Sequence, residues 1–324
     1  MSDPLLEVEN LTMQYSIHGG EVTAVENVSF SVSEGENLGI AGESGSGKSS
    51  IAISLMKLLP ENARILGGKI LLRGMDLAAL SEEEIRPYRG RRIAMVFQAA
   101  MNSLDPVYRT GDQIIEALQN HNQDMNNTAA RARVAELFDL VGLDGSLMDR
   151  YPHQLSGGMR QRAVIAMALA CHPDILIADE PTTALDVIVQ DTILRKMQQV
   201  QERNKLGMIY ISHDIAVISE VSQRIAIMYA GRIMEIAGTK DMFLQPRHPY
   251  TSALLNAFPS ILGPKRQLLS LPGESPDLLH PPSGCRFHPR CPRVLDICRR
   301  EPPPDTDYGN GHLAACHHPV GTDL

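Results

Sequence analysis

A glycine-rich segment, Gly42-Glu-Ser-Gly-Ser-Gly47-Lys48-Ser49, carries the residue types that bind a polyphosphate. It matches the pattern G-x-x-x-x-G-K-[ST] and lies between a short apolar run and a stretch of helical character. Glycines let consecutive backbone N–H groups turn toward phosphate oxygens, and a following helix adds the positive end of its dipole. Lys48 would reach the β and γ phosphates, and the Ser49 hydroxyl would ligate Mg²⁺. The flanking elements favour a phosphate loop over a coincidental Gly/Ser turn.

Two adjacent carboxylates, Asp179 and Glu180, follow the apolar run at residues 175–178. A buried strand that ends in Asp179 would hold Mg²⁺ directly or through water, and Glu180 would polarise the attacking water. Such a pair by itself is often only the N-terminal cap of a helix. Because it follows a phosphate loop along the chain, it indicates the hydrolytic part of a nucleotide site.

Four further motifs occur in a definite order around this acidic strand. The segment Leu155-Ser-Gly-Gly-Met-Arg-Gln-Arg162 precedes the strand and opens a helix, and Ala184-Leu-Asp186 follows it. Gln98 ends an earlier strand and His213 ends a later one. Taken alone, Gln98 would be a surface polar residue and His213 a structural histidine. The whole order, over roughly residues 5 to 245, resembles the ATP-binding cassette (ABC) family.

The resemblance implies an ABC cassette of the P-loop NTPase class. This is an α/β fold with a RecA-like core, an antiparallel β subdomain and a helical subdomain at about residues 99–172. It also implies that two cassettes pack head to tail around two ATP molecules and separate after hydrolysis. Ser156, with the N–H groups that follow it at a helix N-terminus, would form a second anion cradle. The family usually has Gln where this chain has Met159, a change that removes no group expected to touch phosphate.

Individual positions receive roles from the same resemblance. The expected catalytic residues are Glu180, His213 and Gln98, the last coupling nucleotide state to the helical insert, and Mg²⁺ is expected to bind Ser49, Gln98 and Asp179. Tyr15 would stack on adenine, although a lone Tyr after a strand is otherwise a packing residue. The other residues expected to bind ATP within one cassette are Gly42, Glu43, Ser44, Gly45, Ser46, Gly47, Lys48, Ser49 and Ser50. Those expected to contact the ATP of the opposing cassette are Leu155, Ser156, Gly157, Gly158, Met159 and Asp186.

Alternating and continuous apolar patterns predict the elements that must position these residues. Alternation predicts half-exposed strands at residues 5–13 and 22–32. Apolar runs predict strands at 37–41, 91–97, 175–178, 208–211 and 225–229. Helical periodicity appears at residues 49–59, 114–118, 134–141 and 187–200. Strands and helices alternate, which predicts an α/β body with a helical insert.

Four of the five cysteines lie in a proline-rich, irregular region after about residue 258, with the spacing Cys285-x5-Cys291-x6-Cys298-x17-Cys316. In a chain with no export signal, such a group indicates metal ligation before disulfides. The spacing is looser than that of most zinc sites and suits an iron–sulfur cube, whose negative charge five nearby arginines would screen. Composition alone leaves an iron–sulfur cluster and zinc about equal, with reduced buried cysteines as a third alternative.

The cysteine region, preceded by His248-Pro-Tyr-Thr, resembles that of oligopeptide and dipeptide importer ATPases. This resemblance implies a cassette at residues 1–258, a C-terminal region at 259–324, and a [4Fe-4S] cluster on the four cysteines, with zinc as the alternative. It implies ATP and Mg²⁺ as cofactors and di- or oligopeptides, or similar small solutes, as cargo. The implied partners are two membrane-spanning permease subunits, a homologous second ATPase in a heterodimer, and an extracytoplasmic solute-binding protein. The chain would lie peripherally on the cytoplasmic face of the inner membrane.

Composition and charge narrow the function classes. A chain of 324 residues with 43% hydrophobic and 21% charged residues indicates a globular protein of about two domains. The longest apolar run, residues 163–171, falls well short of the roughly 20 residues that span a bilayer. The net charge of −8 disfavours nucleic-acid binding.

Two other function classes are alternatives to a transport ATPase. A soluble ABC ATPase acting on ribosomes or DNA is the main alternative, but each motif occurs once and no sustained heptads separate the two parts of the site. A small-molecule kinase would explain the phosphate loop but not the segment that begins at Leu155.

Overall fold

The computed structural model describes residues 4–98, 100–182, 186–257 and 273–321. Within it the chain divides into two compact units that alternate along the sequence. The first unit comprises Met1–Leu6, Ser31–Asn37 and Leu71–Tyr210, and the second comprises Glu7–Phe30, Leu38–Ile70 and Ile211–Leu324. The domain boundary expected at residues 258 and 259 lies outside the described residues and stays a prediction.

Three buried strands form the sheet of the first unit, in the order β8-β7-β6. They are β6 (Ile93–Val96), β7 (Ile175–Asp179) and β8 (Gly207–Ser212). β6 and β7 run parallel, with Val96 opposite Ala178. Parallel strands are usually covered on both faces, which explains why these segments are unbroken apolar runs rather than alternating ones. The strands predicted here from apolar runs are confirmed.

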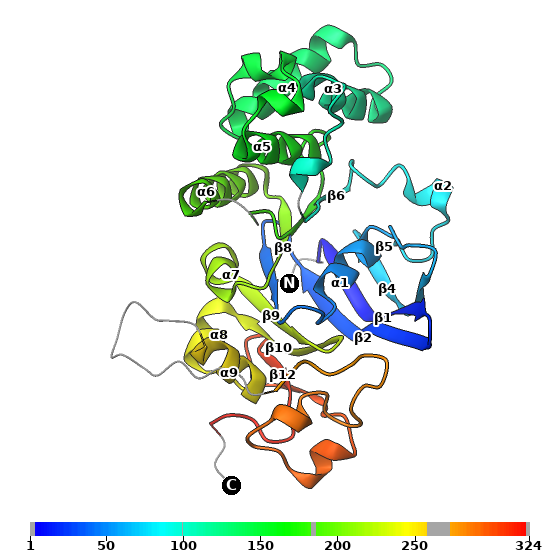
Figure 1. Ribbon diagram of the computed structural model, residues 1–324, viewed down its shortest axis with the longest axis vertical. Coiled ribbons are helices and arrows are strands. Elements are labelled where there is room, and N and C mark those ends of the chain that lie inside the picture. The colour runs from blue at the N-terminus through cyan, green and yellow to red at the C-terminus, as the bar shows by residue number, and fades with distance from the viewer. Residues whose placement is uncertain (1–3, 99, 183–185, 258–272, 322–324) are drawn as a thin grey trace. The chain divides into compact units, whose positions relative to one another are not determined.

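Helices make up most of the rest of the first unit (Figure 1). They are α2 (Glu82–Ile85), η1 (Ala100–Asn102), α3 (Thr110–His121), α4 (Asn127–Leu140), η2 (Gly145–Asp149), η3 (Pro152–Gln154), α5 (Gly157–Ala168) and α6 (Val187–Asn204). The short strand β5 (Met75–Asp76) completes the unit. α3, α4 and α5 pack on one another through buried side chains such as Ile114 and Phe138. The described part of the expected helical insert is therefore helical.

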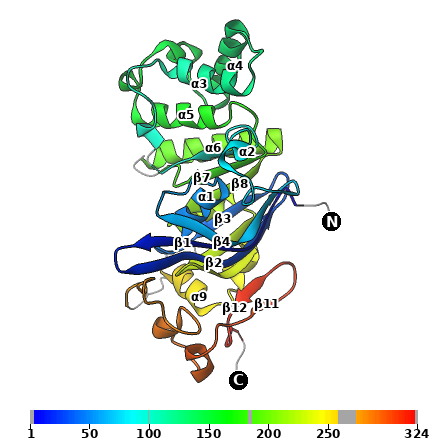
Figure 2. The same cartoon turned by 90° about the vertical axis from the view of Figure 1, so that its right-hand side faces the viewer.

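The second unit contains a sheet with the strand order β2-β1-β4 (Figure 2). Its strands are β1 (Leu6–Ile17), β2 (Gly20–Val32) and β4 (Ala63–Leu72). Buried and less buried residues alternate along most of β1, as expected for a sheet with one face in the core. The two strands predicted from alternation correspond to β1 and β2.

A second ladder in this unit extends from the strand before the phosphate loop into the C-terminal region. Its strands are β3 (Asn37–Ala41), β9 (Arg224–Tyr229), β10 (Arg232–Gly238), β12 (Leu313–Ala315) and β11 (Asp305–Asp307). β3 and β9 are parallel, and the remaining neighbours are antiparallel. The C-terminal region is thus more regular than expected. Three-residue strands are too short to show periodicity, and their hydrogen bonds come from the pairing of β12 with β10 and of β11 with β12.

The helices of the second unit are α1 (Lys48–Leu55), α7 (Ile215–Val221), α8 (Thr239–Leu244), α9 (Pro249–Asn256), η4 (His288–Arg290) and η5 (Asp296–Arg299). α1 is shorter than the helix predicted over residues 49–59. Lys57 adopts a left-handed φ of 50°, which ends the helix before Pro60 is reached. Over the described residues, none of the helices combines the length and apolar character that a bilayer crossing requires.

Phe287 anchors the C-terminal region to the second unit. Its side chain is fully buried, and its ring lies 5.3 Å from each of the rings of Tyr229 and Tyr250. Burying a Phe side chain contributes about 2–3 kcal/mol, and tilted aromatic pairs add to that. The aromatic cluster of Tyr229, Tyr250 and Phe287 therefore holds the irregular chain around the cysteines against β9 and α9.

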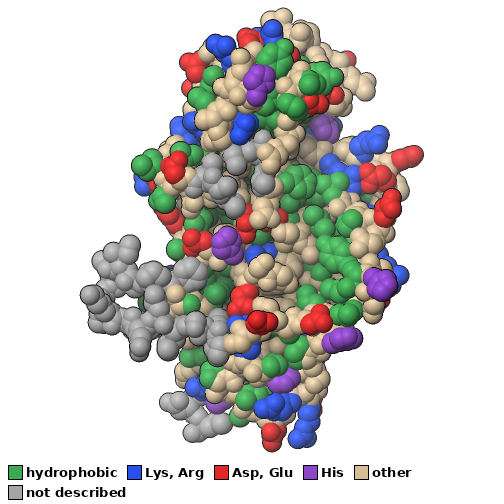
Figure 3. Space-filling view, in the orientation of Figure 1, with side chains coloured by type: hydrophobic (Ala, Val, Ile, Leu, Met, Phe, Trp, Pro, Cys, Tyr) green, Lys and Arg blue, Asp and Glu red, His purple; other side chains and the backbone are tan. Residues whose placement is uncertain are grey.

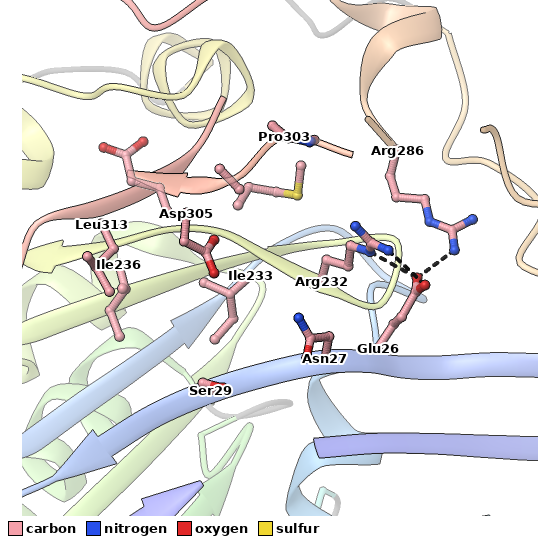
Figure 4. A pocket seen from close by; sticks show the side chains of 13 residues that line it. Glu26, Asn27, Ser29, Arg232, Ile233, Ile236, Arg286, Pro303, Asp305 and Leu313 are labelled. Carbon is pink, nitrogen blue, oxygen red and sulfur yellow. Dashed lines mark hydrogen bonds and ion pairs between the residues drawn. The ribbon is translucent and has the colours of Figure 1, made fainter. Parts of the chain in front are cut away.

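A paired carboxylate, Glu26 on β2, makes a second connection to the C-terminal region. It accepts hydrogen bonds from Arg232 at 2.7 and 2.9 Å and from Arg286 at 2.5 Å, beside a cavity of about 80 Å³ (Figure 4). The hydrogen bond from Arg232, with help from Arg286, lowers the pKa of Glu26 from 4.5 to about 2 despite its partial burial. The carboxylate thus stays ionised far below neutral pH.

Glu26→Gln is expected to lower the free energy of unfolding by about 1–2 kcal/mol at neutral pH, after allowance for the partial exposure of the group. Because the pKa is depressed on folding, this stability is present above pH 4.5 and is lost as the pH falls toward 2. Urea unfolding at a series of pH values checks it. The control Glu9→Gln alters a partly exposed carboxylate of the same unit that pairs with Lys69, so its difference from wild type should be small. A Glu26→Gln deficit that stayed constant down to pH 3 would contradict the assignment.

Candidate nucleotide-binding site

The segment Gly42–Ser49 comprises the loop between β3 and α1 and the first two residues of α1. Its three glycines all have positive φ: 154° at Gly42, 76° at Gly45 and 103° at Gly47. A Cβ at Gly42 would lie 2.2 Å from the Met228 carbonyl oxygen, and one at Gly47 would lie 2.2 Å from that of Ala24. Neighbouring backbone therefore excludes any side chain at these two positions. The glycine spacing of the motif is a steric requirement of the folded loop.

Lys48 is 7% exposed and directs its ammonium group to the loop itself. Its Nζ donates to the carbonyl oxygens of Gly42 and Glu43, both at 2.8 Å, and approaches Ser46 Oγ at 3.5 Å. The cation is thus held among the backbone groups that a phosphate would approach. In so desolvated a position, an interaction with a phosphate is stronger than it would be on the surface.

Ser49, Ser50 and Tyr15 lie close to the start of α1. Ser49 is exposed, and the hydroxyls of Tyr15 and Ser50 are 3.3 Å apart. β1 therefore brings the aromatic ring expected to stack on adenine next to the helix that follows the phosphate loop. His213 belongs to the same unit: it directly follows β8 and is exposed.

Gln98 and Glu180 come together in the first unit because β6 and β7 are parallel and in register. Val96 lies opposite Ala178, so the residues two positions further on emerge side by side at the carboxyl ends of the strands. Gln98 Nε2 donates to Glu180 Oε2 at 2.7 Å. Asp179 is 3% exposed at the last position of β7. Glu180 has a left-handed φ of 47°, a conformation in which a non-glycine residue costs energy and which is common at functional sites.

The segment that begins at Leu155 opens α5. Ser156 is the N-cap of this helix, and its Oγ accepts from the N–H of Met159 at 3.3 Å. Gly157 and Gly158 are the first helical residues, so their N–H groups lie at the positive end of the helix dipole. A Cβ at Gly158 would meet Val189 Cγ1 at 2.8 Å, which places the start of α5 against the start of α6. The N–H groups at this helix start are thus placed where an anion can be bound.

Asp186 is the N-cap of α6, where its side chain accepts from the N–H of Val189 at 2.9 Å. Asp186 therefore stabilises the first turn of this helix. Residues 184 and 185 of the same motif lie outside the described part of the chain.

The structure does not support the expected iron–sulfur or zinc site. Among the described residues, no group of three or more His, Cys, Asp or Glu side chains could hold a metal ion. The four thiols do influence one another electrostatically, but burial raises the pKa of Cys285 to about 11 and that of Cys316 to about 12. Burial therefore disfavours the thiolate form of these two side chains, which is the form in which cysteine binds a metal. The spacing of the cysteines along the chain did not determine whether their side chains form a metal-binding group.

The arginines near the cysteines also have partners other than those expected. Arg286 pairs with Glu26, and Arg290 pairs with Glu43 in the phosphate loop. From the sequence, these guanidinium groups were expected to screen the negative charge of a metal cluster. The contact between Arg290 and Glu43 was not predicted, because the two residues are 247 positions apart and no periodic pattern connects them.

Two family models match the chain. One, described as ABC transporter, matches residues 25–183. The other, described as oligopeptide/dipeptide transporter, C-terminal region, matches residues 234–298. The first match contains the phosphate loop, Gln98 and the acidic strand, and the second contains Tyr250, Phe287 and three of the four clustered cysteines.

Curated relatives are similar to the chain over almost its whole length. The dipeptide transport ATP-binding protein DppD of Bacillus subtilis is 45% identical, covering 97% of this chain and 94% of the relative. The DppD protein of Escherichia coli is 43% identical, with coverages of 98% and 97%. The oligopeptide transport ATP-binding protein OppD of Escherichia coli is 44% identical, with coverages of 98% and 94%.

A solved structure has a similar fold. It is the ATP-binding cassette MJ0796, a dimer in a post-hydrolysis state bound to ADP and Pi. The TM-score is 0.66 at 28% sequence identity, and the match covers 72% of this chain and 98% of the other.

Proposed function

We propose that this chain, which belongs to the ABC transporter family, is the ATP-hydrolysing subunit of a membrane importer of dipeptides or oligopeptides. Relatives more than 40% identical over nearly the full length are named as dipeptide and oligopeptide transport ATP-binding proteins. The observation that carries the ATP-binding part is the glycine-lined loop with Lys48 held at its backbone carbonyls. The C-terminal family match supports the peptide class of cargo.

Each predicted site residue has a role in this proposal. Lys48 and the loop N–H groups bind the β and γ phosphates, and Tyr15 stacks on the adenine. Glu180, oriented by its hydrogen bond from Gln98, accepts the proton of the attacking water. His213 contacts the γ-phosphate. The segment Leu155–Met159 and Asp186 serve the ATP of a second ATPase subunit, as the dimeric state of MJ0796 suggests.

The donor set proposed for Mg²⁺ consists of the Ser49 hydroxyl, the Gln98 amide oxygen and the Asp179 carboxylate. Hard oxygen ligands of this kind suit Mg²⁺. Because the carboxylate of Asp179 is buried, a bound cation would stabilise its charge better than solvent does. The ion would neutralise charge on the phosphates when bound. The proposal includes no iron–sulfur cluster, because the described residues do not form a group that could hold one.

The proposed partners are two permease subunits, a homologous second ATPase and a solute-binding protein that delivers the peptide. In this arrangement the chain lies at the cytoplasmic face of the membrane. The face shown in Figure 3 has Lys and Arg side chains interspersed with Asp and Glu, in keeping with the net charge of −8. The negative net charge of the whole chain disfavours an ATPase that acts on DNA or ribosomes.

Purification of the tagged chain from detergent-solubilised membranes tests the proposal. Permease subunits should copurify and be identified by mass spectrometry, and the assembly in proteoliposomes should hydrolyse ATP faster when a peptide-loaded binding protein is added. An oligosaccharide in place of the peptide is the control and should not stimulate hydrolysis. Copurifying ribosomal proteins or DNA, or stimulation by sugar alone, would contradict the peptide-importer function.

A further inference from the structure

The C-terminal region contacts the phosphate loop directly through Glu43. The Arg290 guanidinium makes a two-pronged ion pair with this carboxylate, with Nη1–Oε2 at 2.8 Å and Nη2–Oε1 at 3.1 Å. Ser275 Oγ donates to the same carboxylate, and the Glu43 N–H donates to the Tyr250 hydroxyl at 3.1 Å. One residue of the loop is therefore held by three side chains that come from beyond residue 249.

The Arg290 side chain is itself fixed by the aromatic cluster. Its Nη1 donates to the Tyr229 hydroxyl at 3.2 Å, and its guanidinium carbon lies 5.6 Å from the centre of the Tyr229 ring. The side chain of Arg290 is 7% exposed, and that of Glu43 is 25% exposed. Two parallel hydrogen bonds between ionised groups in so protected a place are stronger and more directional than a surface ion pair.

The pKa of Glu43 depends on its ion pair with Arg290. Burial alone would raise the pKa of the carboxyl group, but the hydrogen bonds from Arg290 and Ser275 outweigh it and the pKa is lowered. Glu43 is thus an anion at neutral pH in a loop that has to accept an anionic triphosphate. Without Arg290, its partly buried negative charge would repel that ligand.

Glu43 also connects the C-terminal region to the phosphate-binding lysine. While its side chain pairs with Arg290, its carbonyl oxygen accepts from Lys48 Nζ at 2.8 Å. The preceding residue is Gly42, whose backbone conformation no other residue adopts without strain. A shift of Glu43 would therefore move the first turn of the loop and the lysine together.

We infer that Arg290 is a positioning residue of the nucleotide site: it holds and neutralises Glu43, so that the phosphate loop keeps the form and charge that receive ATP. The C-terminal region is then part of the ATP-binding machinery and not only an appendage. The inference rests on the proposed function, since it supposes that the loop binds ATP.

Replacement of Arg290 in the full chain, purified with its copurifying subunits, tests the inference with MgATP as the probe. Arg290→Ala is expected to raise the KM for ATP about tenfold and to change kcat less than about twofold, because the lost contact acts on binding and not on the water-activating carboxylate. Arg290→Lys should recover part of the affinity, since an ammonium restores the charge but not the two parallel hydrogen bonds.

Arg286→Ala is the matched control. It removes an arginine of the same region whose partner is Glu26 on β2 (Figure 4) and not the phosphate loop. It should destabilise the C-terminal region while leaving the KM for ATP unchanged. The double variant Glu43→Gln/Arg290→Ala has no unpaired carboxylate beside the loop, so its KM should lie below that of Arg290→Ala alone.

An unchanged KM in Arg290→Ala, or an equal increase in Arg286→Ala, would overturn the inference. If Arg290→Ala does not fold, Arg290→Lys decides the matter: a KM for ATP above that of wild type supports the inference, and an unchanged KM overturns it. Failure of the wild-type chain to bind ATP would instead refute the proposed function, so the two failures are distinguishable.

Discussion

Replacing Glu180 with glutamine is expected to leave ATP binding intact and to slow ATP hydrolysis by about a hundredfold or more, the usual contribution of a general base. Glutamine has nearly the same size, and its amide oxygen can still accept the hydrogen bond that Gln98 Nε2 donates to Glu180. The local geometry at the end of β7 should therefore survive. What the variant lacks is a group that takes a proton from water.

Phosphate release at saturating MgATP, measured together with the equilibrium Kd for ATP, checks this prediction. Glu82→Gln is the matched control, because Glu82 is an exposed carboxylate of the same unit that pairs with Arg89 on the surface. Its turnover should equal that of wild type. An unchanged turnover in Glu180→Gln would show that another group activates the water.

Replacing Lys48 with alanine is expected to weaken ATP binding by a hundredfold or more. The ammonium is 7% exposed and is already surrounded by loop carbonyls, so its interaction with a phosphate is little screened by water. Loss of a charge-assisted contact of this kind costs roughly 3 kcal/mol, which corresponds to about two orders of magnitude in Kd. Hydrolysis at ordinary ATP concentrations should then be abolished.

Equilibrium binding of ATP to the purified chain, with thermal unfolding as a check on folding, tests this second prediction. Lys69→Ala is the control: Lys69 lies exposed on β4 of the same unit and pairs with Glu9. It should bind ATP as wild type does. A Lys48→Ala protein that retained its affinity for ATP would show that Lys48 does not contact the bound phosphates.

Contiguous motifs could be read from the sequence because their chemistry is local. The phosphate loop depends on three glycines whose positive φ angles are available to few other residues, and the signature near Ser156 depends on a helix N-cap. The pairing of Gln98 with Glu180 could also be predicted, since both follow apolar runs that form neighbouring strands. Short-range hydrogen bonding and backbone sterics were enough for the two motifs, whereas the contact between Gln98 and Glu180 also depends on the pairing of β6 with β7.

Two strands without a regular pattern were not predicted from the sequence, and the end of one helix was predicted too late. β4 contains two adjacent glycines and several exposed positions, and β10 is interrupted by a bulge between Ile233 and Glu235, so neither showed a regular alternation. The end of α1 was placed too late because Pro60 was taken as the stop, whereas the left-handed backbone of Lys57 ends the helix earlier. These features depend on the backbone conformation of single residues.

The amino-acid sequence by itself determined the nucleotide chemistry of this protein, because the groups that perform it lie within a few residues of one another in each motif. Only the tertiary structure decided what the C-terminal region does. Its cysteine spacing pointed to a metal site, but the described residues form no group that could hold a metal ion, and packing of Phe287 against Tyr229 and Tyr250 directs Arg290 to Glu43. A contact between residues 247 positions apart depends on how the whole unit folds, since no local hydrogen bond or periodicity specifies it.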